Sequence, residues 1–309
     1  MTRTIRHLLS IEDLADEELR HLVERGAAFA SGGAPWSTTL AGRVVGIYFR
    51  RTSTRTRTAF SSGALRLGAQ IISYGPHDLQ ENTGEAVADT ARVLSGMLDA
   101  LVIRTADAPE EMRVLADQER MAVVNAMSSD EHPTQAISDL TAMTRHFGRV
   151  QRLRVLYVGE GNNTASALAL ALARYEGVEL RLRTPPGYGL PADKAGAACG
   201  RAATSGATIE ERHTMDDLPA EVDVVYTTRW QTTGTSKADP DWRSTFAPFA
   251  VDERLMARFP NAVFMHDLPA HRGEEVSAPV LEGASSIVFM QAQTKLYSAM
   301  AVLEWGQGG

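Results

Sequence analysis

Short apolar segments rich in β-branched residues alternate along the chain with longer segments in which apolar residues recur at helical spacing. This alternation is typical of strands joined by crossover helices, so it predicts parallel sheets covered by helices. Strands are expected in two series, at 44–49, 70–74, 100–103 and 122–125, and at 154–158, 180–183, 223–226, 262–265 and 287–290. The two series predict an α/β protein with two doubly wound parallel-sheet domains.

The expected helices indicate where the two domains meet. Residues 136–147 have helical spacing and are followed by Gly148, which places the boundary there. Ser10 is expected to cap a helix over 11–28, and another helix is expected over 297–305. The predicted division is a first domain at 1–147, a second domain at 148–290, and a C-terminal helix in 291–309 that packs back on the first domain.

Composition and charge narrow the classes of partner. The 309 residues are 44% hydrophobic and 22% charged, which is enough for a sizeable core. The formal charge of −7 has the wrong sign for a wide nucleic-acid or anionic-membrane surface, so a bound anion would need a local basic cluster. The single Cys199 excludes an internal disulfide, and no window is apolar for about 18 residues. We therefore expect a cytoplasmic protein with neither nucleic acid nor membrane as its partner.

One local basic cluster is present in 49–58, which holds four Arg, four Thr and one Ser. It follows the expected strand at 44–49 and precedes a segment with helical spacing at 59–67. A helix N-terminus presents unpaired N–H donors and a partial positive charge, so a phosphate there would gain backbone, hydroxyl and guanidinium hydrogen bonds. A capped basic surface helix is the alternative, but this density of Arg and hydroxyl groups favours an anion site.

Four motifs carry a resemblance to a known family. Ser53-Thr54-Arg55-Thr56-Arg57 resembles the carbamoyl phosphate motif of the aspartate/ornithine carbamoyltransferases. The segments at 102–105, at 132–135 and at 266–276 resemble, in the same order, the family's Arg-bearing strand end, its HPxQ motif and the ornithine-type HCLPAHRGEEV loop. The resemblance implies carbamoyl transfer with neither a metal nor an organic cofactor.

The resemblance also implies roles at the carbamoyl phosphate site. Carbamoyl transfer passes through a tetrahedral centre whose oxygen becomes negative, so fixed donors lower the barrier. Thr56, Arg104 and His132 are expected to donate to that oxygen, while Gln135 and the carbonyl of Leu268 accept from the carbamoyl NH2. Further contacts are expected from Ser53, Thr54 and Arg55, from Lys295 unless it is a solvated surface lysine, and from Gln80 of an adjacent subunit in a homotrimer with shared active sites. The expected catalytic residues are Arg55, Arg104, His132, Gln135 and Asp267, and His266 is expected to be a structural hydrogen bonder.

The acceptor-binding segment departs from both well-known types. Ornithine enzymes carry an Asp where this chain has Thr228, so the α-ammonium of ornithine would lose its anionic partner there. The segment from Thr228 to Gln231 instead resembles the Thr-Arg-x-Gln of aspartate enzymes, in which Arg and Gln bind carboxylates. Asp267 replaces the Cys of ornithine enzymes, which makes a dicarboxylate poorly matched. Asn163 resembles the acceptor-binding Asn of the ornithine-type GDGNN turn.

These features predict a carbamoyltransferase for a small amino acid, either ornithine-like or a specialised diamino acid such as 2,3-diaminopropionate. Its carboxylate would be held by Arg229, and the amine would lie near Asp267, which either orients it or accepts its proton. The expected acceptor-binding residues are Asn163, Thr228, Arg229, Gln231, Asp267 and Leu268. An aspartate carbamoyltransferase and a non-catalytic carbamoyl phosphate-binding relative remain alternatives. A nucleotide-binding protein is a further alternative, although the G-x-G-x-x-G spacing fails at Thr164.

Overall fold

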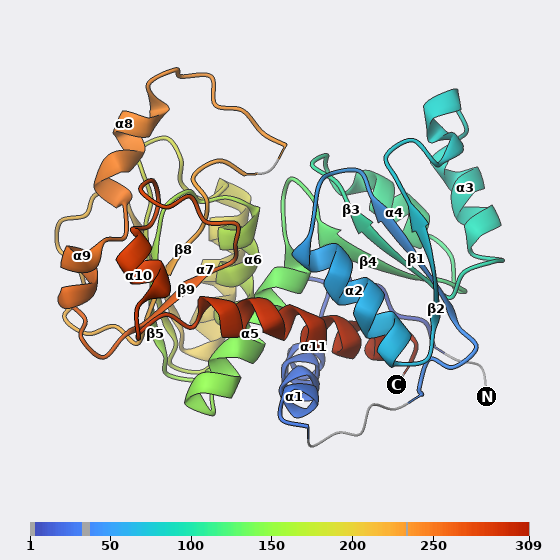
Figure 1. Cartoon of the computed structure of the whole chain (residues 1–309), viewed down its shortest axis with the longest axis horizontal. Helices are drawn as coiled ribbons and strands as arrows, with labels where there is room; N and C mark the ends of the chain where they lie inside the picture. The colour runs from blue at the N-terminus through green and yellow to red at the C-terminus, as the bar shows by residue number, and fades with distance from the viewer. Residues whose placement is uncertain (1–3, 33–37, 233, 309) are drawn as a thin grey trace. The chain divides into compact units, whose positions relative to one another are not determined.

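The computed structural model describes residues 4–32, 38–232 and 234–308. The chain divides into two compact units, which we call unit 1 (Met1–Arg145 with Thr294–Gly309) and unit 2 (His146–Gln293). Each unit is built on its own parallel sheet with helices packed against it (Figure 1). The predicted fold class, two parallel-sheet α/β domains, is confirmed.

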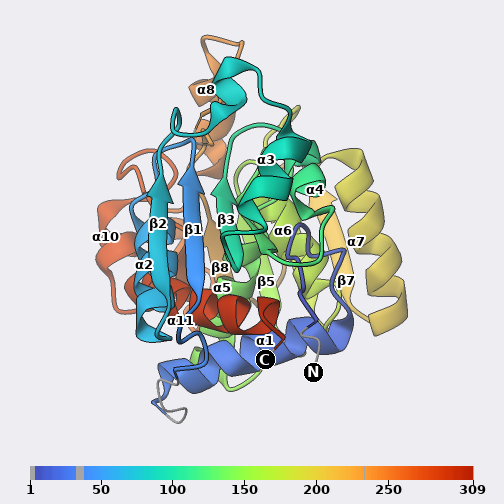
Figure 2. The same cartoon turned by 90° about the vertical axis from the view of Figure 1, so that its right-hand side faces the viewer.

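Unit 1 contains a four-stranded sheet in the order β2-β1-β3-β4. Its strands are β1 (Val44–Phe49), β2 (Gln70–Tyr74), β3 (Ala100–Arg104) and β4 (Ala122–Met127), and its helices are α1 (Asp16–Ala30), α2 (Arg55–Arg66), η1 (Gln80–Thr83), α3 (Val87–Leu94) and α4 (Glu110–Ala116). Buried apolar side chains of α3 and α4 pack against one face of this sheet around Tyr48 and Leu101. Strand β2 forms the outer edge of the sheet (Figure 2), and its residues stay exposed or half-buried.

Unit 2 contains a five-stranded sheet in the order β7-β6-β5-β8-β9. Its strands are β5 (Arg154–Val158), β6 (Glu179–Arg183), β7 (Thr208–Arg212), β8 (Val224–Thr227) and β9 (Val263–His266), and its helices are α6 (Asn163–Leu172), α7 (Ala192–Ser205), α8 (Trp242–Phe246), η2 (Ala247–Phe249), α9 (Glu253–Ala257) and α10 (Ala278–Glu282). All ten residues of α6 are buried, as expected for a helix made almost entirely of small and apolar residues.

Two long helices, α5 (Pro133–Phe147) and α11 (Val288–Gly306), each contain residues of both units. The prediction of a strand at 287–290 is wrong, because α11 begins at Val288. Backbone pairing with Phe264 ends at Ile287, and the apolar residues that follow are the first turn of a helix. A short apolar segment does not by itself distinguish a buried strand from a buried helix.

Two further sequence predictions are corrected by the structure. Helix α1 begins after Ala15, whose backbone N–H is accepted by Glu18, whereas Ser10 donates to the buried carboxylate of Glu131 at 2.6 Å. Strand β7 was not predicted from the sequence, because this partly exposed edge strand, Thr-Ile-Glu-Glu-Arg, has little apolar character. Within the described ranges, no helix is long and apolar enough to span a bilayer.

Candidate active site

The first group of candidate residues lies at the carboxyl end of β1, where a five-residue turn leads into α2. Ser53 is half-buried and Thr54 is exposed at the N-cap position, where its side chain makes no capping hydrogen bond. Arg55 and the buried Thr56 follow in the first turn of α2, which holds no acidic residue. A helix N-terminus of this composition favours a bound anion through its dipole and its N–H groups.

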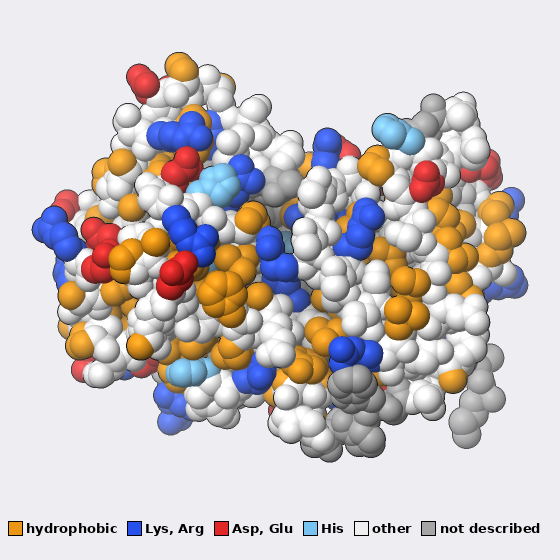
Figure 3. All heavy atoms as spheres, viewed as in Figure 1, with side chains coloured by type: hydrophobic (Ala, Val, Ile, Leu, Met, Phe, Trp, Pro, Cys, Tyr) orange, Lys and Arg blue, Asp and Glu red, His pale blue; other side chains and the backbone are white. Residues whose placement is uncertain are grey.

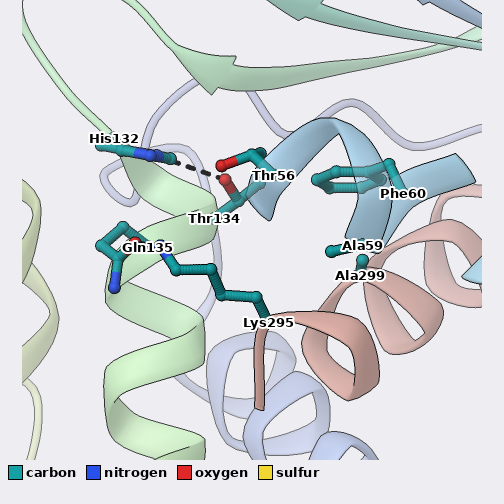
Figure 4. Close-up of a pocket in the computed structure, with 8 residues that line it drawn as sticks. All are labelled: Thr56, Ala59, Phe60, His132, Thr134, Gln135, Lys295 and Ala299. Atoms are coloured by element: carbon teal, nitrogen blue, oxygen red, sulfur yellow. Dashed lines mark hydrogen bonds between the residues drawn. The ribbon is translucent and has the colours of Figure 1, made fainter. Parts of the chain in front are cut away.

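Several predicted site residues of unit 1 line one pocket (Figure 4). Thr56 comes from α2 and Lys295 from α11, while His132, Thr134 and Gln135 come from the residue preceding α5 and from its first turn. Ala59, Phe60 and Ala299 complete the lining. The pocket therefore combines hydroxyl, imidazole, amide and ammonium groups with a small apolar wall.

Arg104 lies beside this group at the end of β3 and is only 8% exposed. The parallel register pairs Arg104 with Phe49, and the backbone N–H of Arg50 donates to the Arg104 carbonyl at 2.9 Å. Its guanidinium is close enough to influence the ionisation of His132. The structure therefore brings Arg104 to the same edge of the sheet as the β1–α2 turn.

The side-chain amide of Gln135 is held in one orientation. Its Nε2 donates to Asp139 Oδ1 at 2.7 Å, and its Oε1 accepts a hydrogen bond from Lys295 Nζ. Gln135 and Asp139 are almost fully buried, and Lys295 is 9% exposed. Lys295 is thus a pocket residue and not a solvated surface lysine, and Gln135 directs its acceptor oxygen towards the pocket.

His132 is buried, and this burial together with the charges of Arg104 and Lys295 lowers its pKa well below the usual value of 6.5. The imidazole is therefore neutral at pH 7. A neutral imidazole still has one N–H to donate, so His132 can stabilise a developing oxyanion without carrying a charge. Thr134 Oγ1 lies 3.3 Å from His132 Nδ1 and helps to orient the ring.

We expect the ligand-free protein to lose stability as the pH falls below about 6.5, in part because of His132. The pKa of His132 is lower in the folded chain than in the unfolded chain, so only the unfolded chain gains this proton as the pH falls through that window. Urea denaturation at pH 7.5, 6.5 and 5.5 measures the effect. The slope should be shallower in the His132→Gln variant, and an equal slope would contradict the lowered pKa.

Gln80, which was expected to act on an adjacent subunit, lies in η1 and is exposed. Its Oε1 accepts a hydrogen bond from Thr83 Oγ1 at 2.9 Å, and Gln80 is not among the residues that line the pocket of its own unit. Within the described ranges, no group of three or more His, Cys, Asp or Glu side chains is arranged to hold a metal ion.

The second group of candidate residues lies in unit 2, at the carboxyl ends of β8 and β9 and at the start of α6. Thr228 Oγ1 donates to Asp267 Oδ1 at 2.8 Å, and Thr164 Oγ1 donates to Asp267 Oδ2 at 3.0 Å. Asn163 is the buried first residue of α6. The contact of Thr164 with Asp267 was not predicted from the sequence, in which Thr164 stands out only as a mismatch to a nucleotide-binding motif.

Two acceptor candidates, Arg229 and Gln231, lie in the loop that follows β8. Arg229 is half-buried, and its buried Nε has no hydrogen-bond partner among the described residues. Gln231 Nε2 donates to the carbonyl of Thr235 at 2.7 Å within the same loop. Arg229 thus keeps donor capacity for a ligand, whereas Gln231 stabilises the loop.

The backbone of Leu268 is fixed by buried side chains. Leu268 has a φ of 55°, and its N–H donates to His266 Nδ1 at 2.8 Å. His266 Nε2 lies 3.3 Å from Glu275 Oε1, and both side chains are fully buried. Because Nδ1 accepts a hydrogen bond, Nε2 carries the proton and donates to Glu275. His266 therefore makes the structural hydrogen bonds expected of it.

A buried lysine holds the loop after β8, and no sequence motif indicated it. Lys237 Nζ forms an ion pair with Glu160 and lies 4.5 Å from the ring centre of Tyr188 and 4.7 Å from that of Phe246. The Lys237 side chain is 4% exposed. Burial raises the pKa of Glu160 despite the nearby ammonium. This pair fastens the loop that carries Arg229 to the turn that precedes Asn163.

Comparisons with known proteins cover nearly the whole chain. Residues 6–145 match the model of the aspartate/ornithine carbamoyltransferase carbamoyl-P binding domain, and residues 151–305 match that of the Asp/Orn binding domain. An ornithine carbamoyltransferase of Synechococcus sp. is 36% identical over 299 residues, 96% of each chain, and one of Anoxybacillus flavithermus is 36% identical over 98% of each chain. The solved structure of ornithine carbamoyltransferase from Pyrococcus furiosus superposes with a TM-score of 0.92 at 34% identity, covering 100% of this chain and 99% of that one.

Proposed function

The chain belongs to the aspartate/ornithine carbamoyltransferase family and is a carbamoyltransferase, and from this premise we propose that it carbamoylates the side-chain amine of a small amino acid, with ornithine as the first candidate. The pocket of unit 1, with Thr56, His132, Gln135 and Lys295 in its lining, is the observation that carries the proposal. Its donors suit the phosphate and the carbonyl oxygen of carbamoyl phosphate, and the oriented oxygen of Gln135 suits the carbamoyl NH2.

In the proposed reaction, the acceptor amine attacks the carbonyl carbon of carbamoyl phosphate. A C–N bond forms, the C–O bond to phosphate breaks, and its electron pair leaves with the phosphate. Starting from the ammonium form, one proton goes to phosphate and one to solvent, so the charges balance. Arg104, His132 and Thr56 donate to the carbonyl oxygen as it becomes negative.

The remaining donor-side residues bind and orient carbamoyl phosphate. Ser53, Thr54 and Arg55 hold the phosphate at the N-terminus of α2, and Lys295 adds a positive charge. Gln135 and the carbonyl of Leu268 accept hydrogen bonds from the carbamoyl NH2. This orientation reduces the entropic cost of bringing the carbonyl carbon to the amine.

On the acceptor side, we assign the amino acid's carboxylate to Arg229, whose planar guanidinium donates two hydrogen bonds at once. Asn163 binds the acceptor's backbone atoms, and Thr228 and Gln231 shape the pocket around it. Ornithine is preferred because the relatives that match the whole chain are named ornithine carbamoyltransferases. A shorter diamino acid such as 2,3-diaminopropionate is the alternative suggested by Thr228 and Asp267.

The test is carbamoyl-phosphate-dependent product formation followed by mass spectrometry. Ornithine, 2,3-diaminopropionate, N-acetylornithine, putrescine and aspartate are offered separately. Fastest turnover of ornithine supports the leading proposal, and fastest turnover of 2,3-diaminopropionate supports the specialised alternative. Turnover of aspartate alone would contradict both, while tight binding of carbamoyl phosphate without any turnover would indicate a non-catalytic relative.

We further propose that the protein is a homotrimer in which Gln80 of one subunit reaches the carbamoyl phosphate of the next. Exposed apolar side chains on unit 1 support an interface, because Ile72 is 44% exposed on edge strand β2, while Val93 and Met97 are 51% and 69% exposed on and just after α3. Figure 3 shows hydrophobic side chains on the part of the surface where Figure 1 places α3 and β2. Exposed apolar side chains of this kind often mark contacts between proteins.

A charge in this surface is expected to dissociate the trimer. Met97→Glu places a carboxylate that would need to be desolvated in the interface, so light scattering after gel filtration should shift towards the monomer. Activity should fall with it, because Gln80 would no longer reach a neighbouring site. Val114→Glu, at an exposed apolar position on α4, is the matched control. A monomeric wild type would contradict the proposal.

A further inference from the structure

Asp267 is a fixed carboxylate that remains partly open to solvent. Its two oxygens each accept one threonine hydroxyl, from Thr228 at 2.8 Å and from Thr164 at 3.0 Å. The side chain of Asp267 is 14% exposed. Since the two threonines come from the end of β8 and the first turn of α6, the carboxylate is held from two sides.

Among the residues that the structure describes, no positive charge compensates Asp267. The threonines are neutral, and among the described residues no Lys or Arg lies within ion-pair distance of it. His266 Nδ1 lies 3.5 Å from Asp267 Oδ1, but it accepts the N–H of Leu268 and therefore carries no proton. A carboxylate with restricted access to water and no countercharge is stabilised strongly by a cationic ligand.

We propose that Asp267 is the specificity-determining residue that binds the side-chain ammonium of the acceptor, the nitrogen that becomes carbamoylated. The inference rests on the proposed function. Asp267 directly precedes Leu268, whose carbonyl is assigned to the carbamoyl NH2, whereas Arg229 is assigned to the acceptor's carboxylate. An ammonium at Asp267 is therefore next to the residue whose carbonyl is assigned to the carbamoyl NH2, and a second carboxylate at this position would be repelled.

Thr228 takes part in the same arrangement. From the sequence, the α-ammonium of ornithine is expected to lack its anionic partner, because position 228 holds no Asp. The structure places a carboxylate one hydrogen bond away from Thr228, supplied by the residue after β9. The cluster therefore keeps one negative charge, which favours a diamino acid acceptor over aspartate.

Two fragments of ornithine test which group Asp267 binds. 5-Aminovalerate keeps the side-chain ammonium and the carboxylate, whereas L-norvaline keeps the α-ammonium and the carboxylate. Calorimetry on the full chain saturated with phosphonoacetamide, a non-reacting analogue of carbamoyl phosphate, measures both affinities. Asp267→Asn should weaken 5-aminovalerate roughly 10- to 100-fold, the range for a charged hydrogen bond, and leave L-norvaline within about twofold. Unchanged L-norvaline binding also shows that the variant is folded.

Asp193→Asn is the matched control, because it removes one exposed carboxylate from the same unit and should change neither affinity.

The outcomes separate this inference from the proposed function. Weakened L-norvaline with unchanged 5-aminovalerate would assign Asp267 to the α-ammonium and overturn the inference. Unchanged affinities for both fragments would also overturn it, while carbamoyl transfer by the wild type would still stand. Failure of the wild type to bind phosphonoacetamide would overturn the proposed function and the inference together.

Discussion

Replacing Arg104 by Met is expected to lower kcat/KM for carbamoyl phosphate by about a thousandfold or more, because the change removes the charged donor proposed for the developing oxyanion. Loss of one oxyanion donor costs about 10²- to 10³-fold in other enzymes, and a charged donor contributes more than a neutral one. Met preserves most of the volume of the buried side chain. Steady-state kinetics with saturating acceptor, and calorimetry of phosphonoacetamide, separate the loss in turnover from the loss in binding.

The matched control for Arg104 is Arg113→Met on α4. Arg113 also lies in unit 1 but is 55% exposed, and its contact with Asp13 is long at 3.8 Å. Its replacement should leave both kinetic constants unchanged within error. Arg104→Lys should recover only part of the activity, since an ammonium lacks the planar pair of donors. Full activity in Arg104→Met would remove this residue from the mechanism.

The donor half of the site could be predicted from sequence because its residues stand in short motifs at predictable places. Thr56 and His132 each lie at the start of a helix that follows a strand, and the carboxyl ends of parallel strands meet at one edge of a sheet. Local spacing therefore sufficed to bring these residues together. The orientation of Gln135 could not be predicted in this way, because it depends on Lys295 from a helix 160 residues further along the chain.

The acceptor half was predicted less completely. Contact of Thr164 and Thr228 with Asp267 requires β8 to lie beside β5 and β9, and this strand order is not contained in any local pattern. The mistaken strand at 287–290 has a related cause, since an apolar segment is compatible with either element until its tertiary neighbours are known. Sequence spacing thus predicted which residues follow each strand. Contacts among residues from three different elements could be found only in the structure.

Lys237 provides the largest expected effect on stability. Its ammonium is buried against the rings of Tyr188, Trp242 and Phe246 and is paired with the carboxylate of Glu160. Replacing it by Met removes the cation and leaves the half-buried carboxylate of Glu160 without its cationic partner. Removing one partner of a buried ion pair typically destabilises a protein by about 3–5 kcal/mol. Urea denaturation followed by tryptophan fluorescence measures this loss.

A double-mutant cycle and the pH dependence test whether the unpaired carboxylate of Glu160 causes the loss of stability. Lys237→Met with Glu160→Gln should be more stable than Lys237→Met alone, because no unpaired carboxylate remains. Burial already raises the pKa of Glu160, so in Lys237→Met the folded chain binds this proton more readily than the unfolded chain does. The stability that this variant loses relative to the wild type should therefore become smaller as the pH falls towards the ordinary carboxyl range.

Arg152→Met, which breaks an exposed ion pair with Glu176, should not change stability measurably. If Lys237→Met and Arg152→Met had the same free energy of unfolding, the pair of Lys237 and Glu160 would not stabilise the loop that carries Arg229.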